Sequence, residues 1–478
     1  MSAQTIDEKL GNAMNAADWF MLDSIYNTTP KDSINPFIEV FSRCLIGNRL
    51  NRTDISIPAF QELLNSQTLD ISTLVSSTHM FGIDLSREGY NAEAASMIKS
   101  IVNQTKQHLD STTVDGLIAS ANRYAALAEY KPYDIVFQDG DIATIPFSIV
   151  PVGPKDKEAV LIHLQRSSIN GIDADITFDT GAGANIISHE IADKYNLVPL
   201  AGTMQTVAGV GRRDGYIAMA KEIKIGNITV KDVPFIVISF STDNDEADKY
   251  IDCFNIVIGS ELMLQLKDLT IDFANRQIII PTQAPTKTDA KPNMCFSAGM
   301  NLLTKGLVNN IPTTMCIDSG DASFGSLNSS FYEINKEHVE QVGRRDTIRS
   351  AGMGGVTITS GYYVPDLPIT IAGTTVLPLE LVVRTSPDKT AISQEANIGL
   401  KTLMLFGRIR FNLVDFVLTT YPYTNSLSVA TVTQGYNAPF FKLSKTLDKP
   451  TILQTLGFIG LGIARSLINP NAPTNPDL

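Results

Sequence analysis

The first part of the chain carries apolar residues at spacings of three and four, which is the period of one buried helix face. Phe37, Val40, Phe41 and Leu45 form one such run. The pattern predicts helices at residues 16–26, 36–46, 59–64, 88–102 and 115–129. We therefore expect an all-α N-terminal domain over residues 1–131.

The purpose of this helical domain stays open between two interpretations. Gly89, Tyr90, Asn91, Ala92 and Ala95 faintly resemble a helical repeat, but one copy does not establish a period. A helical bundle is therefore favoured over a repeat-type scaffold that binds peptides.

The pattern changes after Pro132 to short β-branched runs separated by Gly, Asn, Asp and Pro, which indicates strands. The runs lie at residues 145–152, 160–165, 174–178, 223–225, 233–238 and 278–280. A mainly β region is expected to about Tyr423, followed by a C-terminal extension over 424–478. Gln454 and Arg465 interrupt the apolar stretch 451–468, so a packed helix is a better interpretation than a membrane span.

Composition and charge narrow the possible functions. The 478 residues are 44% hydrophobic and 18% charged, which is ordinary for a globular protein. A net charge of −12 disfavours nucleic-acid binding, which depends on a positive surface. The four cysteines and five histidines are dispersed, so neither a metal site nor a cofactor is indicated. The first residues lack a signal segment, which leaves open a cytoplasmic protein or a mature chain exported to the periplasm or cell surface after loss of its leader.

Candidate chemistry lies at two similar apolar strands, each of which ends in an aspartate, a small hydroxyl residue and glycine. Asp179 begins the sequence DTGA, and Asp318 begins DSGD. A turn dipeptide, Asn170-Gly171 or Asn309-Asn310, stands eight or nine residues before each aspartate. The spacing predicts a hairpin whose second strand delivers the carboxylate. Either tetrapeptide alone would also fit a simple turn.

Three further features recur after each aspartate, and their order indicates an internal duplication of about 140 residues. The first is a pair of closely spaced glycines, the second an apolar segment ending in glycine 80 or 81 residues after the aspartate, and the third a leucine-rich segment with a final strand. In the first copy these features are Gly209 with Gly211, then 257–259, then 262–266 with the final strand 269–273. In the second copy they are Gly352 with Gly354, then 397–399, then 403–406 with the final strand 409–413.

The two copies resemble the retropepsin-like, pepsin-related aspartic proteases, in particular the bacterial members that carry both lobes in one chain. The resemblance covers residues 143–423 and implies two closed β lobes related by a pseudo-twofold axis, at 132–285 and 286–423, after the all-α domain. It implies an endopeptidase that acts on polypeptides as a monomer, without metal or cofactor.

The resemblance also assigns roles to individual residues. Asp179 and Asp318 would be the catalytic pair, which activates water because two close carboxylates resist joint ionisation and share one proton. The hydroxyls of Thr180 and Ser319 would brace the two loops, and Gly181 and Gly320 would let backbone approach the carboxylates. Two glycine-rich flaps would cover the substrate; they contain Gly209, Gly211 and Tyr216, and Gly352, Gly354 and Tyr362.

The second copy departs from the family pattern at two positions. Asp321 stands where the family has Ala or Ser, and Asn397 replaces an apolar residue before Gly399. Asp321 either points away and caps the turn or the following helix, or adds a negative charge that favours the protonated pair. These departures leave an alternative function open, that of a catalytically weak or inactive relative that binds peptides.

Overall fold

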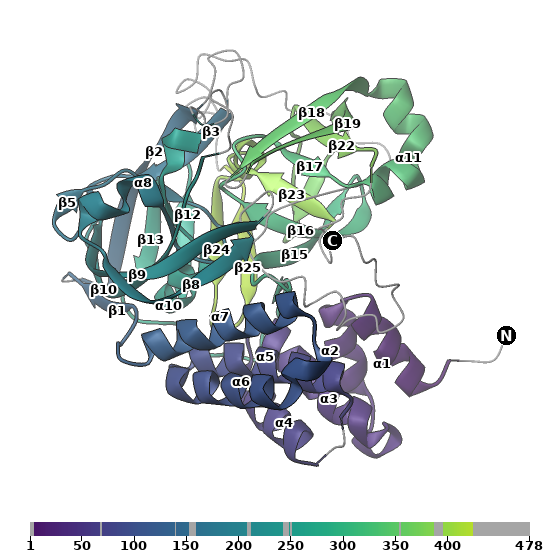
Figure 1. The fold of residues 1–478 in the computed structure, drawn as a ribbon. Helices are drawn as coiled ribbons and strands as arrows, with labels where there is room; N and C mark the ends of the chain where they lie inside the picture. The colour runs from purple at the N-terminus through teal and green to yellow at the C-terminus, as the bar shows by residue number, and fades with distance from the viewer. Residues whose placement is uncertain are drawn as a thin grey trace. The chain divides into compact units, whose positions relative to one another are not determined.

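The computed structural model describes residues 4–66, 69–138, 140–152, 159–207, 212–241, 248, 251–352, 355–386 and 395–423. The chain forms two compact units, and the change from the first to the second falls between Lys131 and Pro132. The helices of the first unit run from purple to blue in Figure 1, and the sheets of the second from blue to yellow-green. The expected C-terminal extension at 424–478, with its apolar stretch, lies outside the described residues.

Residues 4–66 and 69–131 of the first unit form helices joined by short connections. Side chains begin most of its helices: Thr5 and Glu8 form a capping box on the first, and Asp18, Asn35, Asp70 and Asp110 cap later ones. The helices are α1 (Ile6–Asn15), α2 (Trp19–Thr28), η1 (Lys31–Ser33), α3 (Pro36–Arg49), α4 (Thr53–Ser66), α5 (Ile71–Arg87), α6 (Asn91–Thr105), η2 (Lys106–His108) and α7 (Ser111–Leu127).

All five predicted helices are present, although α4 begins six residues before its predicted start and contains Pro58 one turn inside. Two helices, α1 and α5, were not expected from the apolar pattern. Helix α5 escapes that pattern because its buried face is partly polar. Asp84 in α5 is fully buried, and its carboxylate accepts hydrogen bonds from Asn48, Ser56 and Arg87.

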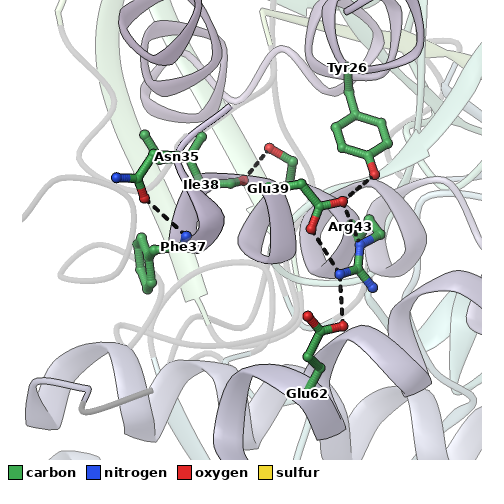
Figure 2. A network of polar contacts seen from close by, with 8 residues as sticks. Tyr26, Asn35, Phe37, Ile38, Glu39, Arg43 and Glu62 are labelled. Atoms are coloured by element: carbon green, nitrogen blue, oxygen red, sulfur yellow. Dashed lines mark hydrogen bonds and ion pairs between the residues drawn. The ribbon is translucent and has the colours of Figure 1, made fainter. Parts of the chain in front are cut away.

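A charged network joins three of these helices side by side (Figure 2). Glu39 on α3 accepts a hydrogen bond from the Tyr26 hydroxyl of α2 at 2.6 Å and a bidentate pair from Arg43 one turn further along. The same guanidinium reaches Glu62 on α4 at 2.8 Å. Bidentate geometry makes the Arg43–Glu39 pair stronger than a typical surface ion pair.

The second unit contains two β lobes whose central strands follow the same path. In the first lobe the order is β6-β11-β7-β10-β9, and in the second it is β16-β23-β17-β22-β19. Each path begins with a parallel pair, continues with an antiparallel pair and a second parallel pair, and ends antiparallel. The prediction of two β lobes after an all-α domain is confirmed.

The first lobe consists of β1 (Asp134–Phe137), β2 (Ile142–Val152), β3 (Ala159–Leu164), β4 (Ser167–Ile169), β5 (Ile172–Asp173), β6 (Ile176–Phe178), β7 (Ile186–Ser188), α8 (His189–Ala192), η3 (Asp193–Tyr195), β8 (Val198–Val207), β9 (Arg212–Ile225), β10 (Ile228–Ile238), η4 (Asp252–Phe254), β11 (Ile256–Ile258), α10 (Ser260–Leu266), β12 (Asp268–Asp272) and β13 (Gln277–Pro281).

The second lobe consists of β14 (Met294–Phe296), β15 (Leu302–Val308), β16 (Ile311–Asp318), β17 (Gly325–Leu327), α11 (Ser329–Val342), β18 (Arg344–Gly352), β19 (Gly355–Pro365), β20 (Ile369–Ile371), β21 (Thr374–Val376), β22 (Glu380–Arg384), β23 (Ala396–Gly399), α12 (Leu400–Leu403), β24 (Arg408–Asn412) and β25 (Val417–Tyr421). The predicted boundary at residue 285 falls between β13 and β14, and it stays a prediction. None of the helices in the described ranges has the length and apolar composition to cross a bilayer.

The predicted hairpins before the two aspartates differ between the lobes. In the second lobe, Asn309 and Asn310 form the turn of the β15–β16 hairpin, both with positive φ, and β16 ends at Asp318. In the first lobe, Asn170 and Gly171 join β4 to β5, a short hairpin whose β4 pairs with β9. The chain then leaves that edge, and β6 pairs instead with β3 and β11. The hairpin prediction is therefore correct for the second lobe and wrong for the first.

The lobes meet where β12 of the first pairs antiparallel with β24 of the second. Thr270 lies opposite Arg410, and these are equivalent positions of the duplication, 140 residues apart. Across this junction Arg410 makes a bidentate ion pair with Asp268, at 3.0 and 2.6 Å. The Asp268 side chain is 3% exposed, so its charge depends on this partner.

We expect Arg410→Ala to lower the free energy of unfolding by about 3 kcal/mol, because it leaves the buried Asp268 carboxylate without its guanidinium. Urea unfolding followed by circular dichroism would measure the change. Arg408→Ala is the control on the same strand, since Arg408 is exposed and lies over the Tyr421 ring; its cost should stay below about 1 kcal/mol. Equal losses in the two variants would contradict this role for the ion pair.

Candidate active site

Two neighbouring loops carry the predicted aspartates, and a parallel strand fixes each of them. Asp179 directly follows β6, and its backbone N–H donates to the carbonyl of Ile258 in β11 at 3.0 Å. Asp318 is the last residue of β16 and lies in register with Gly399 of β23. The two loops therefore occupy equivalent places in the two lobes.

Hydroxyl groups tie the two loops to each other reciprocally. The backbone N–H of Thr180 donates to Ser319 Oγ at 3.0 Å, and the backbone N–H of Ser319 donates to Thr180 Oγ1 at 3.1 Å. Each hydroxyl also donates to a backbone carbonyl of the other lobe, Thr180 to that of Ile317 at 2.6 Å and Ser319 to that of Phe178 at 2.8 Å. Both side chains are fully buried, so these four hydrogen bonds satisfy groups that water does not reach.

The glycine of each loop lies against the carboxylate of the other. A Cβ placed on Gly181 would come within 2.4 Å of Asp318 Cγ, and one on Gly320 within 2.2 Å of Asp179 Oδ2. Any larger residue would force the loops apart. The two glycines are therefore what lets the carboxylates meet.

Backbone donors hold one oxygen of each carboxylate in the same way. Asp179 Oδ1 accepts from Gly181 and Ala182 at 2.8 and 3.1 Å, and Asp318 Oδ1 accepts from Gly320 and Asp321 at 2.9 and 3.0 Å. Burial raises the pKa of both aspartates. For Asp318 the nearby charges of Asp179 and Asp321 raise the pKa further. Such a pair holds a proton at a pH where an isolated aspartate would have lost it.

The two departures from the family pattern contact each other. Asn397 Nδ2 donates to Asp318 Oδ2 at 2.7 Å and to Asp321 Oδ2 at 3.0 Å. Asp321 Oδ1 accepts from the backbone N–H and the hydroxyl of Ser323, at 2.9 and 2.6 Å. Asp321 caps its turn through Ser323, but it does not point away: it shares the Asn397 donor with Asp318, and its charge raises the pKa of Asp318, so the second placement is the one observed.

Two long hairpins stand where the flaps were expected, β8–β9 and β18–β19. In the second hairpin the pairing extends to Gly352, which lies in register with Gly355. Gly209, Gly211 and Gly354 lie outside the described residues.

The two tyrosines predicted to lie in flaps occupy equivalent positions, each opposite a valine on the neighbouring strand of the sheet. Tyr216 makes an edge contact with His189 of α8 at 6.1 Å between ring centroids. Tyr362 is 7% exposed and stacks on Tyr332 of α11 at 5.8 Å. Both rings thus pack against the helix of their own lobe, and a role in substrate binding stays a prediction.

Two asparagines that support the first loop were missed at the sequence level. Asn301, before β15, donates from Nδ2 to the carbonyl of Gly181 in the other lobe. Asn185 accepts from the backbone N–H of Gly259 at 3.1 Å and donates to the carbonyl of Pro234. Neither stands in a recognisable motif, because each acts through backbone groups distant in sequence. In the ranges that the structure describes, no group of His, Cys, Asp or Glu is arranged to hold a metal ion.

A comparison with known protein families covers the segment around Asp179. Residues 166–247 match the family described as "gag-polyprotein putative aspartyl protease". The match spans Asp179, β7 and the β8–β9 hairpin, and it supports a retropepsin-like aspartic protease domain in this part of the chain. No curated protein matches the chain.

We expect Thr180→Val to cost about 2 kcal/mol of stability, because it removes the hydroxyl that serves Ile317 and Ser319 and leaves two buried backbone groups unsatisfied. Thr177→Val is the matched control. Thr177 is equally buried, but its hydroxyl has no hydrogen-bond partner among the described residues, so the change should be nearly neutral. Chemical denaturation of both variants would measure the difference, and a similar cost in the two would contradict the bracing role of Thr180.

Proposed function

We propose that this protein is an aspartic endopeptidase in which Asp179 and Asp318 form the catalytic dyad. The observation that carries the proposal is the mutual approach of two equivalent Asp-hydroxyl-Gly loops, tied by the reciprocal Thr180–Ser319 hydrogen bonds. The family match at residues 166–247 supports a protease domain around the first aspartate. The second aspartate and its role rest on the symmetry of the two loops.

The proposed reaction uses one ionised and one protonated carboxyl group. The ionised carboxylate takes a proton from a water molecule whose oxygen attacks the peptide carbonyl carbon, while the protonated carboxyl donates to the carbonyl oxygen. The tetrahedral intermediate then collapses: the carboxyl group that gained the water proton gives it to the amide nitrogen, a hydroxyl of the intermediate returns its proton to the other carboxylate, and the C–N bond breaks to leave a carboxylic acid and an amine. The dyad ends with one proton, as it began, so neither a metal nor a covalent intermediate is needed.

The duplication supplies both carboxyl groups from one chain, so we propose that the monomer is the active form. The two hairpins, β8–β9 and β18–β19, would cover an extended polypeptide from both lobes and exclude water. Both hairpins are long, which favours a polypeptide substrate that is bound over several of its own residues.

A second candidate is a peptide-binding relative with little or no turnover. The observation that favours it is the third carboxylate, Asp321, beside the proposed dyad. An added negative charge would impair catalysis if it kept both dyad members protonated at the working pH.

We expect Asp179→Asn and Asp318→Asn each to reduce peptidase activity by at least about 100-fold, because each removes a proton acceptor or donor from the reaction. Cleavage of an unfolded protein from pH 3 to 7 would measure this. Circular dichroism would verify that both variants fold, as asparagine keeps the shape of aspartate. Peptide binding without cleavage in the unchanged protein would support the second candidate, and full activity in both variants would exclude the dyad.

We also expect a bell-shaped dependence of kcat/KM on pH, with its upper limb above the ordinary aspartate pKa of about 4. The lower limb is the protonation of the remaining carboxylate, and the upper limb is loss of the shared proton. Burial raises the pKa of both aspartates, so the shared proton is lost at higher pH and activity extends toward neutrality. An upper limb at or below pH 4 would contradict the raised pKa of the dyad.

A further inference from the structure

We propose that Asn397 and Asp321 form a positioning pair for Asp318 that makes the two members of the dyad unequal. Each was recognised only as a departure from the family pattern, and their contacts show that they are a single feature. The inference rests on the proposed function of the same site.

The contacts fix all three side chains together. The two hydrogens of the Asn397 amide are both used, one on Asp318 Oδ2 and one on Asp321 Oδ2. Asn397 is 2% exposed and lies on β23 between β16 and β17, so its backbone cannot move independently. Asp321 is held through Ser323, and its carbonyl accepts from the backbone N–H of Leu400 at 2.8 Å.

The first lobe has no counterpart of this pair. The positions equivalent to Asp321 and Asn397 are Ala182 and Val257, which carry no side-chain donor or charge. The backbone N–H of Ser260 donates to the carbonyl of Ala182 at 2.8 Å, and the backbone N–H of Leu400 donates to the carbonyl of Asp321 in the same way. This backbone contact is therefore the same in the two lobes. Asp321 and Asn397 therefore make the surroundings of Asp318 different from those of Asp179.

The two members of the pair act on Asp318 in opposite directions. An amide donor stabilises an ionised carboxylate, so Asn397 lowers the pKa of Asp318. The negative charge of Asp321 disfavours a second negative charge and raises it. The other titratable groups that act on this region are Asp179, which also raises the pKa of Asp318, and the Cys316 thiol, which burial keeps neutral.

Because the two effects have opposite signs, the test expects shifts of the pH limb in opposite directions, which unfolding of a variant would not produce. Asp321→Ala and Asn397→Val convert each position to the residue of the first lobe. We expect Asp321→Ala to move the upper limb of kcat/KM down by about one pH unit and Asn397→Val to move it up by about one unit. The double variant should lie between them. Shifts in the same direction, or none in either variant, would overturn the proposal.

Two further variants separate charge from shape. Asp321→Asn keeps the shape of the side chain and one oxygen that can accept from Ser323, but it removes the charge and the oxygen that accepts from Asn397. It should therefore shift the limb down as Asp321→Ala does, and an unchanged limb would mean that the charge of Asp321 does not act on the dyad. Glu333→Ala removes an exposed carboxylate of α11 and should leave the profile unchanged. If Asn397→Val does not fold, the two Asp321 variants still decide the direction of the charge effect.

A measurement without turnover distinguishes this proposal from the proposed function. Carboxyl carbon NMR, with Asp318→Asn to assign the Asp318 signal, would follow its titration in the unchanged protein, Asp321→Ala and Asn397→Val. Opposite shifts of the midpoint in an inactive protein would support the pair and reject the peptidase. An active protein whose Asp318 midpoint is the same in all three would reject the pair and leave the peptidase standing.

Discussion

The site depends on bringing two carboxylates together where water is largely excluded, an arrangement that like charges oppose. Four hydrogen bonds among Thr180, Ser319 and the carbonyls of the opposite loops counter that repulsion. Glycine at both contact points removes the steric obstacle, since even one added carbon would meet the facing carboxylate. The β lobes provide the rigid strands that hold these loops at one place.

The same constraint explains why each loop is anchored to a distant strand. The segment that ends in Gly259 or Gly399 runs parallel to the strand before the aspartate and passes beneath the loop. A Cβ on either glycine would approach a backbone carbonyl within 2.4 Å, so the strand could not pass so closely with another residue. This contact accounts for the apolar-glycine segment at the same distance after each aspartate.

The sequence was sufficient for the lobes because the duplication marks them: the strands, the two aspartates and the final pairing strands recur at a fixed offset. It was insufficient for α5, whose interior contains Asp84 and other polar residues that interrupt the helical period. The meaning of Asp321 and Asn397 was also hidden, because they lie 76 residues apart and only β23 brings them together. The prediction that a hairpin delivers Asp179 was wrong because a turn dipeptide specifies only the turn. The strand with which the following strand pairs depends on the whole sheet.

The junction strands differ in charge, and this bears on how the lobes recognise each other. Strand β12 carries Asp268 and Asp272, and β24 carries Arg408 and Arg410. In the observed register Asp272 lies opposite Arg408, so acidic residues face basic or neutral ones. Two first lobes joined about Thr270 would set Asp268 against Asp272, and two second lobes joined about Arg410 would set that arginine against itself. Like charges directly opposite destabilise a strand pair. The junction therefore favours the first lobe joined to the second over either lobe joined to its own copy. In a newly made chain, pairing of β12 with β24 of the same chain is thus favoured over pairing with the same strand of another copy.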